Sequence, residues 1–300
     1  MKKITKFAAG LALIASVALP STAHSDSALW ADPVEIDAEF PPALAEINFQ
    51  SHGAKLNGHI YLANGAGPHP TVVLLHGFPG NEKNLDLAQA LRRVGFNVMF
   101  FHYRGAWGSG GKFSFLNVIE DVASALDYLR TPETTDQYRI DPERLSLVGH
   151  SMGGFAALMG GGKDKSVTCT VGIAAANIGY PDPRERPEGF WDGFASYTDT
   201  LTMLNTESGK AVIDEMLERA SEMDTRTLAP QFSGRPVLLI AGEQDMVTAP
   251  AQTHIPVVQA YEAQGDIELT HKIMQGDHSF SWTRFELTKT VSGWLDSNCR

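Results

Sequence analysis

The segment Gly149-His-Ser151-Met-Gly153 constrains this chain more than any other part of its sequence. The apolar run 145–148 comes directly before it, and the small and apolar residues 155–159 follow it. This order predicts a strand, a sharp turn and a helix, with Ser151 at the turn. Glycines two residues on either side leave room for the strand and the helix to approach each other. We therefore expect the Ser151 hydroxyl to stand clear of a sheet, beside N–H groups at the start of the helix.

Along most of the chain, short apolar segments alternate with amphipathic ones. Residues 71–75 form a continuous apolar run, which is typical of a strand buried on both faces of a parallel sheet. Asn117, with Glu120 three residues later, indicates a capping pair at the start of a helix. The alternation predicts an α/β protein whose mostly parallel eight-stranded sheet is covered by helices on both faces. The expected strands are 45–49, 55–62, 71–75, 97–103, 145–148, 167–176, 237–241 and 267–273, and the expected helices are 85–94, 117–129, one directly after Ser151, 188–204, 209–223 and 282–295.

The first 23 residues have the features of a secretory signal peptide. Three lysines come first, residues 7–19 are apolar, and Ser21-Thr-Ala23 provides small residues for cleavage. The apolar run is too short to span a bilayer comfortably, and no cysteine lies near the expected cleavage point after Ala23. We therefore expect a secreted or periplasmic protein in which residues 24–300 form a single domain, with no membrane insertion after cleavage.

Composition and charge restrict the kinds of partner. The 300-residue chain is 43% hydrophobic and 20% charged, an ordinary globular composition, and its net charge is −11. Because the leader carries three lysines and no acidic residue, its removal leaves a net charge of −14. An acidic protein repels phosphate backbones and anionic lipid surfaces, so we expect neither nucleic-acid nor membrane partners. Nothing in the sequence indicates an oligomeric state.

The two cysteines of the chain, Cys169 and Cys299, are candidates for a disulfide. Export would permit one, because disulfides persist outside the reducing cytosol. However, Cys169 lies within an apolar, strand-like run, where a free buried thiol is the commoner state. We therefore expect free thiols, with the disulfide as the alternative.

One long segment, residues 178–235, interrupts the alternation of strands and helices. An insertion at this point would lie above the carboxyl ends of the strands, where ligands bind in open α/β sheets. We interpret the segment as a small helical lid on a single domain. The alternative is a surface excursion without a role in binding. The aromatic residues of the segment that are candidates either for substrate contact or for the core of the lid are Phe190, Trp191 and Phe194.

Chemistry at Ser151 requires two further side chains. A serine hydroxyl becomes a good nucleophile when a histidine removes its proton, and a carboxylate fixes the tautomer of that histidine. Asp245 follows the strand expected at 237–241, and His278 follows the strand expected at 267–273. Because the carboxyl ends of parallel strands meet at one edge of a sheet, we expect Ser151, Asp245 and His278 to converge there.

Other acidic residues and histidines lie near the same strand ends. Glu243 is a second candidate acid, although its place next to the strand end favours a side chain turned into the loop. Asp277 is adjacent to His278, and neighbours in sequence rarely point at one another. Only His278 lies in the loop after the last expected strand. The other histidines considered are His76, His150, His254 and His271.

A tetrahedral intermediate on Ser151 would need two N–H donors for its oxyanion. Met152, directly after Ser151, provides one of them from its backbone. The loop His76-Gly-Phe78-Pro-Gly80 follows the strand expected at 71–75, and Phe78 provides the second N–H from this loop. We therefore expect Phe78 and Met152 to form the oxyanion hole.

The glycine-rich stretch 105–112 is similar to a phosphate-binding loop but does not meet its spacing. Phe113 stands where a serine or threonine is required. We instead expect Trp107 and Phe113 to be walls of the substrate pocket. No group of His, Cys or carboxylate residues has the spacing of metal ligands, so we expect neither a metal nor another cofactor.

Taken together, these motifs resemble those of the α/β-hydrolase superfamily over about residues 45–295. Their wording is most similar to the bacterial branch that includes feruloyl- and cinnamoyl-type esterases and the catalytic domains of prolyl-oligopeptidase-like (S9-type) peptidases. The resemblance implies the α/β-hydrolase fold and a serine nucleophile, but no particular substrate. The motifs that carry it are His76-Gly-Phe-Pro-Gly80, Tyr103-Arg-Gly105, the segment 141–154, Gly242-Glu-Gln-Asp245 and Asp277-His-Ser-Phe280.

These observations predict a serine hydrolase that cleaves carboxylic esters of small or medium acyl groups through an acyl-enzyme. The alternative with the same chemistry is a peptidase that acts on short peptides. The expected lid has no clear acidic pair to bind a peptide amino terminus, and Glu185 and Glu188 are the candidates left open. A catalytically inactive binding protein on the same fold is a third hypothesis.

Overall fold

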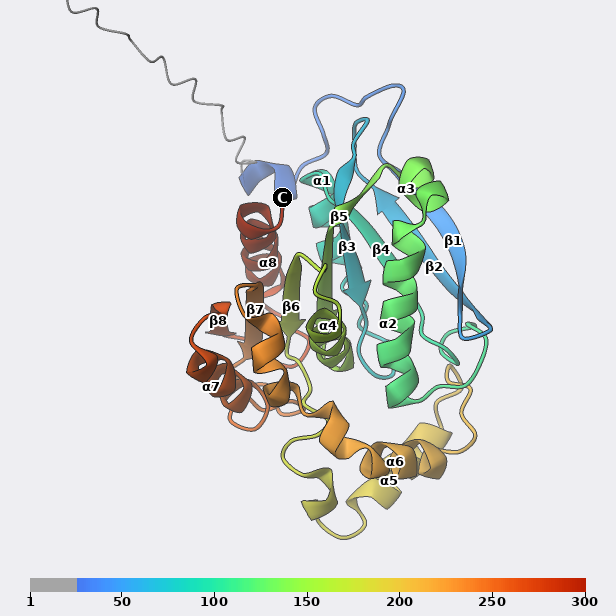
Figure 1. Cartoon of the computed structure of the whole chain (residues 1–300), viewed down its shortest axis with the longest axis vertical. Helices are drawn as coiled ribbons and strands as arrows, with labels where there is room; N and C mark the ends of the chain where they lie inside the picture. The colour runs from blue at the N-terminus through green and yellow to red at the C-terminus, as the bar shows by residue number, and fades with distance from the viewer. Residues whose placement is uncertain (1–25) are drawn as a thin grey trace, which may run out of the picture.

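Eight strands form one sheet in the computed structural model, which describes residues 26–300 (Figure 1). The strand order is β1-β2-β4-β3-β5-β6-β7-β8; β1 and β2 run antiparallel to their neighbours, and the strands from β4 to β8 pair in parallel. The predicted α/β class with a mostly parallel eight-stranded sheet is therefore confirmed. The strands are β1 (Ala43–Ser51), β2 (Ala54–Leu62), β3 (His69–Leu75), β4 (Asn97–Phe101), β5 (Ile140–His150), β6 (Cys169–Ile173), β7 (Pro236–Gly242) and β8 (Glu268–Met274).

Helices cover both faces of the sheet. Alternate residues of a strand point to opposite faces, and in β3 Val73 contributes to one hydrophobic cluster while Val72 contributes to another. The first cluster includes side chains of α2, α4 and α7, and the second includes side chains of α1 and α8. The helices are α1 (Leu85–Arg93), α2 (Phe115–Arg130), α3 (Pro132–Tyr138), α4 (Met152–Lys163), α5 (Phe190–Asp199), α6 (Gly209–Glu218), α7 (His254–Gln264) and α8 (Arg284–Asn298).

The start of α2 differs from the sequence-based expectation. Ser114, and not Asn117, caps the helix, because its hydroxyl accepts the backbone N–H of Asn117 at 3.2 Å. Glu120 does not reach back to the helix start and instead binds the guanidinium of Arg104 at 2.5 Å. The predicted capping pair is therefore wrong, because Glu120 is engaged by a side chain that is distant in sequence.

The sequence-based prediction gave no range for two helices, α3 and α7, although it placed a helix start near His254. The hydroxyl of Thr131 caps α3, and Pro132 occupies its first turn. In α7, Pro256 also lies in the first turn, where a missing N–H costs no intrahelical hydrogen bond. Both segments thus contain a proline that is compatible with a helix because of its position.

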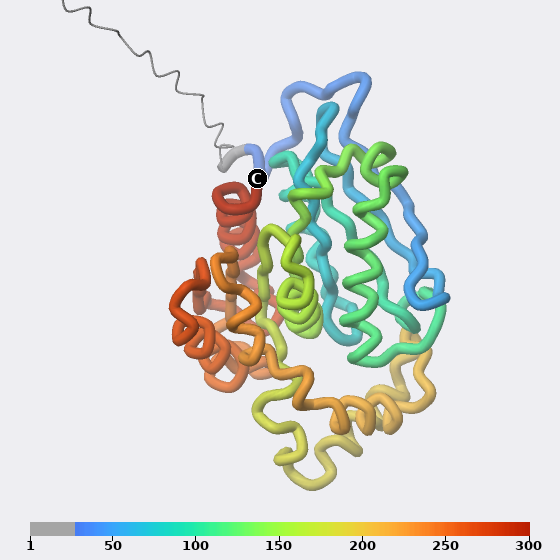
Figure 2. The backbone as a smooth tube through the Cα atoms, viewed as in Figure 1, coloured from blue at the N-terminus to red at the C-terminus, as the bar shows by residue number. Residues whose placement is uncertain are grey.

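The segment between β6 and β7 contains α5, α6 and three short 3₁₀ helices, η2 (Pro183–Glu185), η3 (Ala220–Met223) and η4 (Thr225–Phe232). In Figures 1 and 2 this yellow and orange segment lies beyond one end of the sheet, with α5 and α6 packed together. It is joined to the loop after β4, since the N–H of Trp107 donates to the carbonyl of Met203 at 2.8 Å and Leu204 forms a β-bridge with Ala106.

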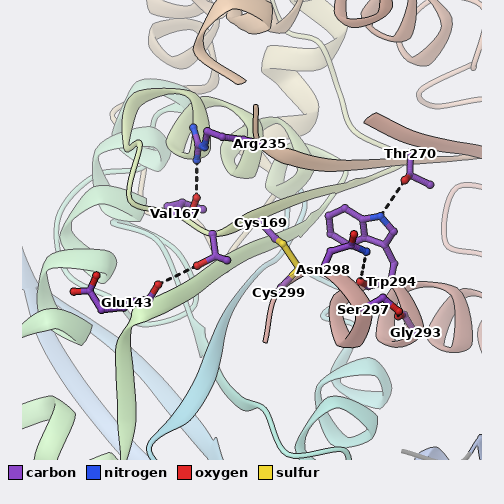
Figure 3. Close-up of a disulfide and its surroundings, with 11 residues drawn as sticks. Glu143, Val167, Cys169, Arg235, Thr270, Gly293, Trp294, Ser297, Asn298 and Cys299 are labelled. Atoms are coloured by element: carbon purple, nitrogen blue, oxygen red, sulfur yellow. Dashed lines mark hydrogen bonds between the residues drawn. A yellow bond between two sulfur atoms is a disulfide. The ribbon is translucent and has the colours of Figure 1, made fainter. Parts of the chain in front are cut away.

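Cys169 and Cys299 form a disulfide across 130 residues of sequence (Figure 3). The expectation of free thiols is therefore wrong. Cys169 begins β6, and α8 runs back along the sheet and ends beside it, so that both cysteines are buried at 1% exposure. The indole N–H of Trp294 in α8 also donates to the hydroxyl of Thr270 in β8 at 3.1 Å. The disulfide and this hydrogen bond thus connect the C-terminal helix to β6 and β8.

The expected signal peptide, residues 1–23, lies outside the described residues. Within residues 26–300, no helix has the length and apolar character needed to span a bilayer.

Candidate active site

Ser151 lies at the tight turn between β5 and α4, in a conformation that few residues other than glycine adopt. Its φ is 58° and its ψ is −121°, which indicates local backbone strain. The two flanking glycines are required by close backbone approach. A Cβ atom at Gly149 would lie 1.9 Å from the carbonyl oxygen of Gly153, and one at Gly153 would lie 2.1 Å from that of Leu75. The strand and helix can therefore approach closely enough to hold the serine at the apex.

The structure brings Ser151, His278 and Asp245 into one hydrogen-bonded chain. The Nε2 atom of His278 lies 2.9 Å from the hydroxyl oxygen of Ser151, and its Nδ1 atom lies 2.8 Å from Oδ2 of Asp245. The loops after β5, β7 and β8 supply the three side chains, as the sequence predicts for the shared edge of a parallel sheet. The contact with Asp245 assigns the Nδ1 proton to that side, which leaves Nε2 to accept the serine proton.

Hydrogen bonds keep the carboxylate of Asp245 ionised although it is only 2% exposed. Burial alone would raise its pKa, but hydrogen bonds from His278 and Thr248 outweigh burial and lower the pKa to about 2. The backbone N–H groups of Val247 and Thr248 donate to Oδ1 at 2.7 and 2.9 Å, and the Thr248 hydroxyl lies 2.6 Å from Oδ2. Thr248 was not predicted as a site residue. The signal in the sequence is its place three residues after Asp245, where an aspartate side chain commonly accepts backbone N–H groups and closes a turn.

The alternative acids are engaged elsewhere. Glu243 is exposed and binds the side-chain amides of Gln244 and Gln275. Asp277 accepts the backbone N–H and the hydroxyl of Ser281, at 2.8 and 2.7 Å. Neither carboxylate contacts His278, so the geometry favours Asp245.

His150 was also missed as a contributor to the site, although its position next to Ser151 was noted. Its Nε2 lies 2.7 Å from the backbone carbonyl of His278, and the two rings lie 4.8 Å apart. Burial is the main cause, and the nearby His278 the second, of a lowered pKa of about 4 for His150. His150 is therefore a neutral donor to that carbonyl. His150 thereby positions the loop that carries His278.

The backbone N–H groups of Phe78 and Met152 are the predicted oxyanion donors. Both line the cavity with Ser151, and Met152 is the first residue of α4, whose N–H has no acceptor within the helix. The N–H of Phe78 makes no hydrogen bond to any described residue. Gly77 brings this loop close, since a Cβ atom there would lie 3.0 Å from Cβ of Ser151. Both N–H groups therefore remain available to an oxygen atom beside Ser151.

A cavity of about 360 Å³ opens beside Ser151 and is mostly apolar. The segment between β6 and β7 forms much of its wall, and the ring of Phe194 stacks on that of Phe78 at 5.5 Å. The predicted lid residues Phe190, Trp191 and Phe194 all line this cavity.

Trp107 and Phe113 lie outside the cavity, so their prediction as pocket walls is wrong. The indole N–H of Trp107 donates to the carbonyl of Pro79 at 2.8 Å, which holds Trp107 against the loop 76–80 and outside the cavity lining. Phe113 is only 3% exposed and packs behind the ring of Phe78, with the ring centroids 5.5 Å apart. Phe113 therefore supports the ring of Phe78, Trp107 is bonded to the adjacent Pro79, and neither residue lines the cavity.

Within residues 26–300, no group of three or more His, Cys, Asp or Glu residues is arranged to hold a metal ion.

Comparison with known proteins agrees with this geometry. Residues 72–286 match the Alpha/beta hydrolase family. The chain belongs to this family. Among the relatives of this alpha/beta hydrolase are an uncharacterized protein, YfhR, of Salmonella typhimurium (29% identity over 181 residues, 59% of this chain and 54% of the relative) and thiohydrolase apmlB of Arthrinium phaeospermum (28% over 132 residues, 43% and 41%). The chain thus spans about half the length of the curated relatives it matches.

Solved structures of low sequence identity share the fold of this alpha/beta hydrolase. Est1E of Butyrivibrio proteoclasticus, solved with ferulic acid bound, has a TM-score of 0.62 at 14% identity and covers 84% of this chain and 98% of its own. The acylaminoacyl peptidase of Pyrococcus horikoshii has a TM-score of 0.60 at 16% identity and covers 87% and 42%. The predicted resemblance to esterases and to peptidase catalytic domains is confirmed at the level of the fold.

The buried histidines lead to a prediction for stability against pH. The pKa of His254 in α7 is lowered from its usual 6.5 to about 4, mainly because the side chain is buried and secondly because His271 is near. As the pH falls from 6.5 toward 4, the unfolded chain takes up a proton at this position and the folded chain does not, so the free energy of unfolding falls. We expect His254→Asn to make this fall shallower by up to about 1.4 kcal/mol per pH unit, measured by urea unfolding across the window. Parallel pH profiles for the two proteins would contradict this prediction.

Proposed function

We propose that this chain hydrolyses carboxylic esters through an acyl-enzyme formed on Ser151. The observation that carries the proposal is the hydrogen-bonded chain from Ser151 through His278 to Asp245. Ser151 lies on a strained turn and lines an apolar cavity. This combination supplies a nucleophile, a base, and a group that orients the base.

The geometry supports the following steps. His278 Nε2 takes the hydroxyl proton of Ser151 while the serine oxygen attacks the ester carbonyl carbon. The oxygen that becomes negatively charged accepts the N–H groups of Phe78 and Met152. His278 then returns the proton to the leaving alkoxide, which departs as an alcohol and leaves the acyl group on Ser151. Water, deprotonated by the same histidine, attacks the acyl carbon, and the products are a carboxylic acid and free Ser151.

The cavity favours esters over peptides as substrates. Its wall is largely apolar and, within the described chain, includes no carboxylate that could bind a peptide amino terminus. Glu185 and Glu188, the acidic candidates of the lid, are exposed and lie outside the cavity lining. Structural neighbours include Est1E, bound to ferulic acid, and an acylaminoacyl peptidase, and one relative is named a thiohydrolase. A peptidase on the same residues is therefore the second candidate.

We also propose that the protein works outside the cytosol, in a periplasm or after secretion. The Cys169–Cys299 disulfide supports this, because disulfides persist in oxidising compartments. The leader-like residues 1–23 support it independently. The acidic net charge supports small-molecule substrates over nucleic-acid partners.

A paired turnover assay tests the choice between ester and peptide. p-Nitrophenyl acyl esters of increasing chain length are compared with aminoacyl and dipeptidyl p-nitroanilides, with Ser151→Ala as the blank. We expect turnover of the esters, with an optimum chain length set by the cavity, and little cleavage of the anilides. Efficient anilide cleavage would instead identify a peptidase.

A further inference from the structure

One side chain in the cavity lining carries a charge, and the charge is positive. Among the described residues that form the wall, Arg186 is the sole ionised group, and the others are mainly aromatic and aliphatic. Arg186 lies between η2 and α5, and its side chain is exposed. A cation therefore stands where the apolar cavity meets solvent.

Arg186 differs from the neighbouring arginines in having no acidic partner. Arg184 binds Asp182 at 2.6 Å, and Arg226 binds Asp224 at 2.7 Å. The guanidinium of Arg186 lies over the ring of Phe190, 5.4 Å from its centroid, and forms no ion pair with any described residue. Contact with an aromatic face orients a guanidinium but leaves its N–H donors available.

Two other polar side chains of the lining are already occupied. The amide of Asn177 donates to Asp224 at 2.9 Å, and its carbonyl oxygen accepts the N–H of Thr225 at 3.2 Å. The hydroxyl of Thr248 is bound to Asp245. Apart from Ser151, Arg186 is therefore the charged residue of the described lining whose N–H donors are free to bind a ligand.

We propose that Arg186 selects esters whose acyl group has an apolar body and ends in a carboxylate. The inference rests on the proposed ester hydrolysis at Ser151. The acyl group stays attached to Ser151 after the alcohol leaves, and we place it in this cavity, which opens beside Ser151. The planar guanidinium matches a carboxylate with two parallel hydrogen bonds, and the aromatic wall covers the apolar body. Since the whole protein is strongly acidic, a local cation is needed to attract such a substrate.

The test uses matched pairs of substrates. Each p-nitrophenyl ester of an ω-carboxyalkanoic acid is compared with its ω-carboxamide counterpart, which has the same shape and no charge. We expect the ratio of kcat/KM, carboxylate over carboxamide, to exceed one at the best-fitting chain length and to decrease with added salt. Arg186→Met is expected to lower this ratio by about fivefold, the upper end of the effect of a solvent-accessible ion pair.

Arg184→Met is the matched control. It removes the same charge from the same loop, but Arg184 is paired with Asp182 and lies outside the cavity lining. An equal change of the ratio in both variants, or no change in Arg186→Met, would overturn the inference. A second measurement distinguishes failure of this inference from failure of the proposed function. If wild type turns over neither ester of a pair, ester hydrolysis is refuted. If Ser151→Ala, which leaves the esters intact, binds the carboxylate and the carboxamide with equal affinity, the role of Arg186 is refuted.

Discussion

Replacing Ser151 with alanine is expected to lower kcat for any ester substrate by about a millionfold, to a residual rate due to the oxyanion hole and binding. The reason is that Ser151 supplies the oxygen that attacks the ester. Without it His278, whose Nε2 lies 2.9 Å from that oxygen, has no serine hydroxyl to activate. The measurement is turnover of a p-nitrophenyl ester beside a thermal unfolding curve.

The fold should survive this substitution. Ser151 has a φ of 58°, and alanine is at least as strained there, but the turn is held by Gly149 and Gly153 and by the bond from the Ser151 N–H to the carbonyl of Ile173. A variant with near wild-type turnover would refute the catalytic role. A variant that has lost both turnover and its folded spectrum would require Ser151→Cys as a second test, which keeps a nucleophile at the same site.

Loss of the Cys169–Cys299 disulfide should have the largest effect on stability. The bond closes a loop of 130 residues and thereby restricts the unfolded chain. In the chain-entropy description a loop of this length contributes about 4 to 5 kcal/mol, and measured losses in proteins are about 2 to 5 kcal/mol. We expect a double Cys169→Ala, Cys299→Ser variant to unfold roughly 8 to 16 °C below wild type for a loss of about 4 kcal/mol.

Reduction provides the control for this prediction. Treating wild type with a thiol reductant should shift its unfolding temperature to that of the double variant and should leave the variant unchanged. If the reduced and oxidised wild-type proteins unfold at the same temperature, the disulfide has no stabilising role in solution.

The local features of the site were predictable because they depend on residues close together in sequence. The turn at Ser151 needs glycines at two fixed positions, and both are visible in the sequence. The convergence of Asp245 and His278 follows from strand order alone, since parallel strands end at one edge. The helix start at Ser114 was misplaced, because the choice between Ser114 and Asn117 depends on where Glu120 finds its partner, Arg104.

Features that depend on tertiary packing were not predictable in the same way. Cys169 reads as a buried strand residue, and only the path of α8 shows that Cys299 reaches it. Trp107 follows a strand as a pocket residue would, but its indole hydrogen bond to Pro79 holds it against the loop 76–80, outside the cavity lining. The support that Thr248 gives to Asp245 depends on a turn whose side-chain contacts are set by folding.

Labelling with a fluorophosphonate, followed by peptide mass spectrometry, tests most directly whether Ser151 is an activated nucleophile. We expect one stoichiometric adduct on Ser151, with no adduct in Ser151→Ala and greatly slowed labelling in a His278 variant. Such a result would establish an activated serine independently of the choice of substrate. An unlabelled wild-type protein, or an adduct on another residue, would show that Ser151 is not an activated nucleophile and would favour the hypothesis of a catalytically inactive binding protein.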